Sequence, residues 1–282
     1  MEQALLIPDH EAEQIVKDLG IPPCPEILTK LLREMREDEP DYIKISNLIS
    51  GDVSLAAAVL KTVNSPFFGL RKKATSVQQA LTLLGLRNVK EIVTGLLLKN
   101  ALPTGNSAAL EHFWDSSSGI AQAASMLAGP LAGLDREEAY TFALFRDCGI
   151  PLMVKRYPDY DSFYTKAVNA ATSFTGAEIA KYAMDHARVG AHLARSWDLP
   201  NEICDAIARH HDYEALSDDN VPVKIRKLIA LTLAAENIHA RCASGLACPE
   251  WAKGSEFAIA ALGTSENVLE DHLDMIEGIL GL

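Results

Sequence analysis

Residues 89–97 have the sequence VKEIVTGLL, with apolar side chains at positions 89, 92, 93, 96 and 97. Intervals of three and four residues place such side chains on one face of an α-helix. Residues 27–35, ILTKLLREM, repeat this spacing with Ile27, Leu28, Leu31, Leu32 and Met35. The pattern predicts amphipathic helices, and no segment of the sequence has the clear alternation that is typical of a strand.

Outward from these two segments, most of the chain is predicted to be helical. In the amino-terminal part we expect helices at residues 9–19, 42–49 and 52–63, a capping box formed by Ser76 and Gln79, and a helix end at Gly85. The later predicted helices span residues 109–128, 136–155, 160–171, 175–196, 200–210, 221–241 and 265–280, with residues 243–254 in a loop. The fold class is therefore all-α, with about a dozen helices.

Residues 102–108, LPTGNSA, combine proline, glycine, asparagine and serine, which favour turns over regular structure. This segment is the best candidate for a junction between two parts of the chain. We therefore expect a two-lobed helical bundle, with residues 1–103 in one lobe and residues 109–282 in the other. The length of 282 residues allows one large domain or two such lobes.

Composition and charge restrict the classes of function. The 38 acidic and 26 basic residues give a net charge of −12, so phosphate backbones are repelled and nucleic acid is not expected as a partner. The five cysteines show no Cys-x-x-Cys spacing, which is typical of a reducing compartment. The sequence has no apolar run of about 20 residues, and its first residues lack the bases of a signal peptide. We expect a cytoplasmic protein without membrane association.

A DNA-binding regulator is nevertheless one hypothesis. Residues 83–91, LLGLRNVKE, could form a helix–glycine–helix turn that presents backbone amides to phosphate. Salt-sensitive contacts would then centre on Arg71, Lys72, Lys73 and Lys90. A plain interhelical turn and a solvated basic loop are the favoured interpretations, because the acidic chain opposes DNA binding.

Histidine and aspartate mark the candidate chemistry. His186, His192, His210 and His211 lie within 26 residues of one another, on two predicted helices. Adjacent residues on a helix diverge by about 100°, so one of His210 and His211 could face a metal while the other faces a substrate or the core. Spacing alone leaves structural histidines as the alternative to a metal site.

Asp147 lies in residues 142–153, FALFRDCGIPLM, where apolar residues flank it. A buried carboxylate requires a cation, hydrogen-bond donors or a metal ion. The neighbouring Arg146 is one candidate cation, although adjacent residues on a helix do not face each other.

Several short segments carry a resemblance to a known family: residues 113–117 (FWDSS), 146–149 (RDCG), 185–191 (DHARVGA), 197–200 (WDLP) and 210–211 (HH). Residues 64–69 (NSPFFG) and 80–85 (ALTLLG) agree as well. In order and spacing these segments resemble HDOD domains, which are bacterial signalling domains related to the metal-dependent phosphohydrolases of the HD superfamily. The resemblance covers residues 21–212 and implies an HD-like helical fold.

HD hydrolases hold one or two metal ions with histidine and aspartate side chains, and these ions activate water. The resemblance implies a cleft at the corresponding positions, which are Ser116, Arg146, Asp147, His186, His210, His211 and Ala235. In that comparison, Ser116 and Arg146 replace histidine ligands and Ala235 replaces an aspartate. Arginine has no lone pair to donate, and its charge opposes a cation. We therefore expect a degenerate site with no metal, no cofactor and no hydrolysis. If an ion binds, Asp147, His186, His210 and His211 would hold it.

Three functions follow as hypotheses. The first is a non-catalytic bacterial signalling or regulatory domain that binds an unknown protein partner or a small ligand. The second is a residual metal-dependent phosphohydrolase acting on nucleotides or cyclic dinucleotides, and the third is the DNA-binding regulator. We further expect Trp114, Trp197 and Leu199 to be buried, and the Arg146 guanidinium to lie within reach of Asp147 or of one of the three cleft histidines.

Overall fold

The computed structural model describes residues 20–280, except residues 36, 38, 66, 67, 71, 106, 169 and 171. Within this part of the chain every regular element is a helix, which confirms the predicted all-α class. The helix expected at residues 9–19 lies outside the described residues, as does Arg71 of the basic cluster.

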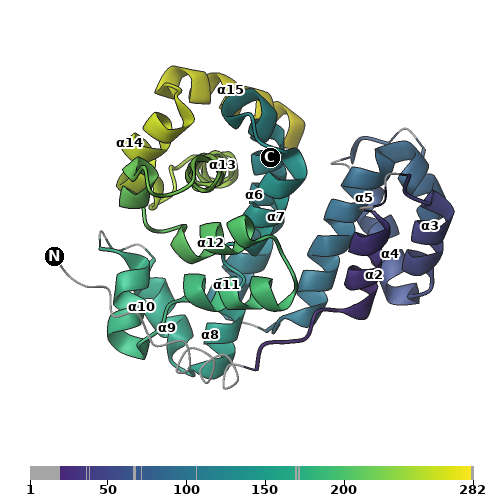
Figure 1. The fold of residues 1–282 in the computed structure, drawn as a ribbon, viewed down its shortest axis with the longest axis horizontal. Coiled ribbons are helices and arrows are strands. Elements are labelled where there is room, and N and C mark those ends of the chain that lie inside the picture. Colours follow the sequence, from purple (N-terminus) through teal and green to yellow (C-terminus); the bar gives the residue numbers. More distant parts are fainter. Residues whose placement is uncertain are drawn as a thin grey trace.

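The smaller lobe contains four helices, seen on the right of Figure 1: α2 (Glu26–Glu34), α3 (Tyr42–Ser50), α4 (Val53–Val63) and α5 (Val77–Ala101). Short polar side chains cap α4 and α5 as expected. The carboxylate of Asp52 accepts from Leu55 N at 2.9 Å, and the hydroxyl of Ser76 accepts from Gln79 N at 3.1 Å. Gly85 interrupts α5 with a φ of 78°, a conformation that a residue with a side chain rarely adopts.

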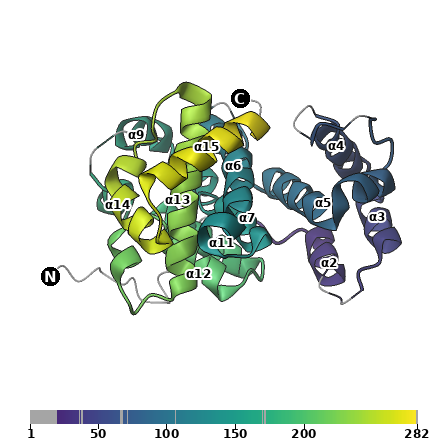
Figure 2. The same ribbon diagram turned by 90° about the horizontal axis from the view of Figure 1, so that it is seen from above.

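The larger lobe contains the remaining helices, on the left of Figure 1. They are α6 (Ala108–Leu127), η2 (Ala128–Ala132), α7 (Arg136–Phe145), α8 (Ile150–Arg156), α9 (Tyr160–Ala167), α10 (Phe174–Tyr182), α11 (His186–Ser196), α12 (Asn201–Arg209), η3 (Glu214–Ser217), α13 (Val223–Ser244), α14 (Trp251–Leu262) and α15 (Glu266–Leu280). Helix α13 is seen end-on in Figure 1, and Figure 2 shows it lengthwise with α15 crossing it. It packs against α6, α12 and α14, and α12 in turn packs against α11, so α13 lies at the centre of the larger lobe.

The two lobes are joined through α5, which packs against α7 of the larger lobe. Buried apolar side chains from both lobes form one hydrophobic cluster, including Leu98 on α5 and Phe142 on α7. The predicted junction lies between α5 and α6. The division into residues 1–103 and 109–282 stays a prediction.

Two long predicted helices are each divided in the structure. The helix expected at residues 136–155 is split into α7 and α8 by a turn at residues 146–149. The helix expected at residues 175–196 is split into α10 and α11, because Ala183 adopts a left-handed φ of 57° and Asp185 caps a new helix by accepting from Arg188 N at 2.8 Å. Both interruptions lie next to candidate site residues.

The loop expected at residues 243–254 is partly wrong. Helix α14 begins at Trp251 and continues to Leu262, and no side chain caps its first turn. Its start therefore lacks the Ser, Thr, Asp or Asn signal from which a helix is recognised in a sequence.

None of the described helices is long and apolar enough by itself to cross a bilayer. Among them, only α3 and α4 together reach the necessary length and apolar composition, and they are bent by 112° relative to each other.

Candidate functional site

A turn between two short helices positions the first candidate residues. Residues 146–149 connect α7 to α8, and Gly149 brings this turn against α11. A Cβ atom at Gly149 would overlap the carbonyl oxygen of His186 and lie 2.8 Å from Gly190 N. Glycine is therefore required for a close approach of two backbones, and this approach places Asp147 beside His186.

The substitution Gly149→Ala is expected to lower the free energy of unfolding by about 1–3 kcal/mol, because the added methyl group meets backbone atoms that cannot rotate away. Thermal or urea denaturation would measure the loss. Gly129→Ala is the matched control, since a Cβ at Gly129 meets nothing within 4 Å. Equal stability of the two variants would contradict the close approach.

The three histidines reach the same place from the ends of helices. His186 is the first residue of α11 and is completely buried, with its ring 5.1 Å from that of Phe174. Helix α12 ends at Arg209, so His210 and His211 follow the helix rather than continue it. Their ring centres lie 4.2 Å apart. Both rings therefore belong to one cluster. The expectation that only one of the two histidines faces it is wrong.

The ligand atoms of Asp147, His186, His210 and His211 all lie within 4.8 Å of one another, and we call this group the His–Asp cluster. The Oδ1 atom of Asp147 is 3.1 Å from His210 Nε2 and 3.3 Å from His186 Nε2. The Nε2 atom of His186 is 3.4 Å from that of His210 and 3.2 Å from that of His211. Four potential ligand atoms thus converge from α11, the end of α12 and the α7–α8 turn.

Each histidine is oriented through its other ring nitrogen. The Nδ1 atom of His186 is 2.7 Å from Glu178 Oε2, that of His210 is 2.8 Å from the carbonyl oxygen of Ile207, and that of His211 is 3.1 Å from Glu250 Oε2. These acceptors assign a proton to every Nδ1 and direct every Nε2 toward the centre of the cluster.

Two tyrosines complete this outer layer. Tyr160 donates a hydrogen bond to Glu178, and Tyr213 donates to Glu250 Oε2 at 2.7 Å. Both carboxylates are therefore held by at least two donors each, which fixes the orientation of the histidines that they contact.

Charges within the cluster are strongly coupled. Burial alone would raise the pKa of Asp147, but Arg146 and the hydrogen bonds from His186 and His210 hold it well below its usual range. Burial lowers the pKa of His186, yet Glu178 and Asp147 outweigh burial and raise it to about 10. His186 is therefore a positively charged imidazolium at neutral pH, with a proton on each ring nitrogen. Burial and the neighbouring His210 lower the pKa of His211 to about 4.

Arg146 occupies the outer face of Asp147. Its side chain is buried, with Nη2 3.0 Å from Asp147 Oδ2 and Nη1 donating to the carbonyl oxygen of Ala143 at 2.8 Å. The expected proximity of the guanidinium to the cleft acid is thus observed. The adjacent pair lies where α7 ends: Arg146 follows the helix and keeps helical backbone angles, and Asp147 is the next residue of the turn.

A sequence model of the HDOD domain matches residues 21–213. The chain belongs to the HDOD domain family. The uncharacterized Treponema pallidum protein to which it is similar is 26% identical over 207 residues, which cover 71% of this chain and 40% of that protein. The HDOD chain therefore spans less than half the length of this relative.

Solved structures share the fold of this HDOD domain. A candidate phosphohydrolase from Shewanella amazonensis superposes with a TM-score of 0.73 and 22% identity, covering 95% of this chain and 96% of the other. A candidate signal transduction protein from Marinobacter aquaeolei gives a TM-score of 0.74 and 19% identity, covering 94% of this chain and 60% of the other. At these identities the likeness establishes the fold alone.

Besides Arg146, which contacts Asp147, two of the predicted cleft positions lie outside the His–Asp cluster. Ser116 lies on α6, where its hydroxyl donates to the carbonyl oxygen of His112 at 2.6 Å. Ala235 lies on α13 and is completely buried. His192 is half-buried and also outside the cluster.

Glu236, the neighbour of Ala235, was not singled out in the sequence. Burial and the charge of Asp147 raise its pKa to about 7, against the opposing effect of Arg146. The charges of Arg146 and Asp147 both act on Glu236, so this carboxyl belongs to the electrostatic surroundings of the site.

The His–Asp cluster has the ligand types for a single metal ion. Tetrahedral ligands at about 2.0–2.1 Å from an ion lie about 3.3–3.4 Å from one another. Four of the six separations among the ligand atoms, between 3.1 and 3.4 Å, match this spacing, and all six are within 4.8 Å. A cation held by Asp147, His186, His210 and His211 would replace the Nε2 proton of His186, and a metal ion of this kind can activate a bound water.

Proposed function

We propose that this HDOD domain is a non-catalytic signalling domain with a degenerate metal site, and that it acts by binding a protein partner or a small ligand. The observation that supports this most directly is the position of Arg146. Its buried guanidinium contacts Asp147 Oδ2, while Asp147 Oδ1 faces the histidines. A fixed positive charge thus stands on the face of Asp147 where a second cation would have to bind.

The number of protein ligands supports the same proposal. Catalytic ions keep a coordination position open for water, whereas structural ions are enclosed by four protein side chains. The His–Asp cluster supplies four donors. A tetrahedral ion held by all four, as zinc prefers, would bridge α11, α12 and the α7–α8 turn without a position for a nucleophile. Such an ion would stabilise the domain and would not activate water.

The prediction is that purified protein contains at most one transition-metal ion per chain and does not hydrolyse phosphoesters. Elemental analysis would count the ion, and turnover of bis(p-nitrophenyl) phosphate and of a cyclic dinucleotide would be followed with added manganese. Any bound metal should be lost in His211→Ala and retained in His192→Ala, which is outside the cluster. Turnover that chelators abolish and that Asp147→Ala removes would overturn the proposal.

A residual phosphohydrolase is the second candidate, favoured by one observation. A hollow of about 600 Å³ borders His211 and is lined by Arg188, Arg195 and Arg209. A phosphoester could approach the cluster there. Asp185, Asp205 and Asp212 line the same hollow and balance the arginine charges, which weakens the attraction for an anion.

A further inference from the structure

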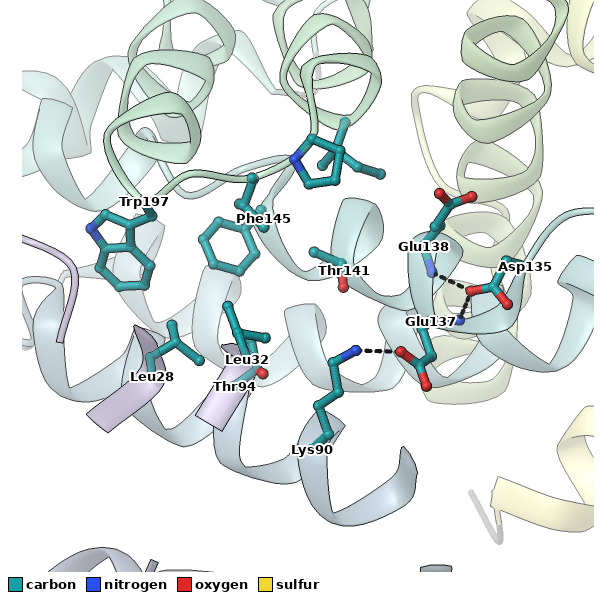
Figure 3. Close-up of a pocket in the computed structure, with 13 residues that line it drawn as sticks. Leu28, Leu32, Lys90, Thr94, Asp135, Glu137, Glu138, Thr141, Phe145 and Trp197 are labelled. Atoms are coloured by element: carbon teal, nitrogen blue, oxygen red, sulfur yellow. Dashed lines mark hydrogen bonds and ion pairs between the residues drawn. The ribbon is translucent and has the colours of Figure 1, made fainter. Parts of the chain in front are cut away.

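A second pocket lies between the lobes and is separate from the His–Asp cluster. It has a volume of about 190 Å³ and is shown in Figure 3. Helices α2 and α5 of the smaller lobe form one wall, and α7 with the α11–α12 connection forms the other. Its apolar lining consists of Leu28, Leu32, Phe145, Trp197, Leu199 and Ile203. We call it the interlobe pocket.

Two hydroxyl groups in the interlobe pocket lack protein partners. Thr94 is 7% exposed, and neither its hydroxyl nor that of Thr141 makes a hydrogen bond within the described part of the chain. Thr82, on the same helix as Thr94, instead donates to the carbonyl oxygen of Gln78 at 2.9 Å. An apolar pocket with a few free polar groups is the usual form of a small-molecule site.

The charges at one end of the pocket define the chemistry of its ligand. The lining there contains Asp135, Glu137 and Glu138, with Lys90 as the basic residue. Lys90 forms an ion pair with Glu137, drawn as a dashed line in Figure 3, and Glu138 pairs with Lys224 at 2.7 Å. This end of the pocket therefore has three carboxylates and two ammonium groups, and its net charge is negative. Anionic ligands such as phosphates are therefore disfavoured.

Two residues that line the pocket are adjacent in the chain to segments that carry the His–Asp cluster. Phe145 lines the pocket and directly precedes Arg146 and Asp147 in the chain, and Trp197 directly follows α11, which begins at His186. Figure 3 shows the Phe145 and Trp197 rings side by side on one wall, facing Leu28 and Leu32. A bound molecule would contact both lobes and two segments that position the cluster.

We infer that the interlobe pocket binds a small aromatic molecule with a neutral or cationic hydrogen-bonding end. Its ring would contact the partly buried Leu32 and Leu199 and the small exposed part of the Trp197 ring, whereas the Phe145 ring behind them is completely buried. Its polar end would bond to the Thr94 and Thr141 hydroxyls. This inference rests on the proposed function, since it names the small ligand through which a non-catalytic domain responds.

Three probes with the same ring test the inference: 2-phenylethanol, 2-phenylethylamine and 3-phenylpropionate, each titrated calorimetrically into the full chain. The alcohol and the amine should bind, and the anionic propionate should bind about tenfold more weakly or not at all, a difference of about 1.4 kcal/mol. Absence of binding by the alcohol and the amine, or tightest binding by the propionate, would overturn the inference.

Variants locate the binding. Thr141→Phe and Leu32→Phe fill the pocket from opposite lobes, and each should abolish binding in a protein whose helical circular dichroism is unchanged. Thr94→Val should weaken binding about two- to tenfold by removing one hydrogen bond, whereas Thr82→Val, outside the pocket, should not. Binding that survives both filling variants would contradict the assignment. Phosphoester turnover would remove the proposed function without affecting these titrations, so the two failures are distinguishable.

Discussion

Replacement of Trp197 by alanine is expected to lower the free energy of unfolding by about 3–5 kcal/mol. The side chain is 3% exposed and packs edge-on against Phe145, with 5.7 Å between ring centres. Its Nε1 donates to the carbonyl oxygen of Pro22 at 3.0 Å. The substitution removes a large buried ring and leaves that carbonyl without its donor. Urea denaturation followed by circular dichroism would measure the shift in midpoint.

Trp114 provides the comparison for this experiment. It is only partly buried, its Nε1 has no hydrogen-bond partner, and Lys99 lies over its ring at 5.6 Å from the ring centre. Because Trp114→Ala removes less buried surface and an unsatisfied donor, it should destabilise the protein by only about 1–2 kcal/mol. A loss at Trp114 equal to that at Trp197 would contradict the packing role assigned to Trp197.

The helices were predictable because their apolar spacing reflects burial directly. The Val89, Ile92, Val93 and Leu97 face of α5 is buried as its periodicity indicates. The breaks at residues 146–149 and at Ala183 were not predictable in the same way. The first break has a local signal that was overlooked, since Gly149 precedes α8 and Pro151 lies in its first turn. Ala183 has no such signal and takes a left-handed conformation that alanine does not favour, so tertiary packing determines that interruption.

The members of the His–Asp cluster were all singled out from the sequence, but their arrangement was not. His210 and His211 converge because α12 ends one residue before them, and helix ends are the least predictable feature of a helix. Glu178 and Glu250 were missed. Glu178 is eight residues and Glu250 is 39 residues from the histidine that it orients, and in both cases a helix boundary lies between them. An isolated glutamate in a helical sequence normally indicates a solvated surface.

Leu199 shows a related limit. It was expected to be buried, yet it is only partly buried and lines the interlobe pocket. An apolar residue near a helix boundary has the same sequence signal whether it fills a core or borders a cavity. The pocket arises from the way α2 and α5 meet α7, which is a property of the assembled lobes. Its ligand chemistry therefore depends on residues that are distant in the sequence, such as Thr94 and Thr141.

Glu178 should be the most sensitive residue of the outer layer, and we expect Glu178→Ala to lower the free energy of unfolding by about 3–5 kcal/mol. Glu178 is completely buried and accepts from His186 Nδ1 at 2.7 Å, from His186 N at 3.2 Å and from the Tyr160 hydroxyl. Its removal leaves three buried donors without an acceptor and the protonated His186 without its closest counter-charge. Glu178→Gln keeps an acceptor oxygen and should lose less, while Glu26→Ala, in an exposed ion pair with Lys30, should leave the denaturation midpoint nearly unchanged. If the Glu178→Ala and Glu26→Ala variants had the same denaturation midpoint, the stability of the cluster would have to depend on Asp147 and not on Glu178.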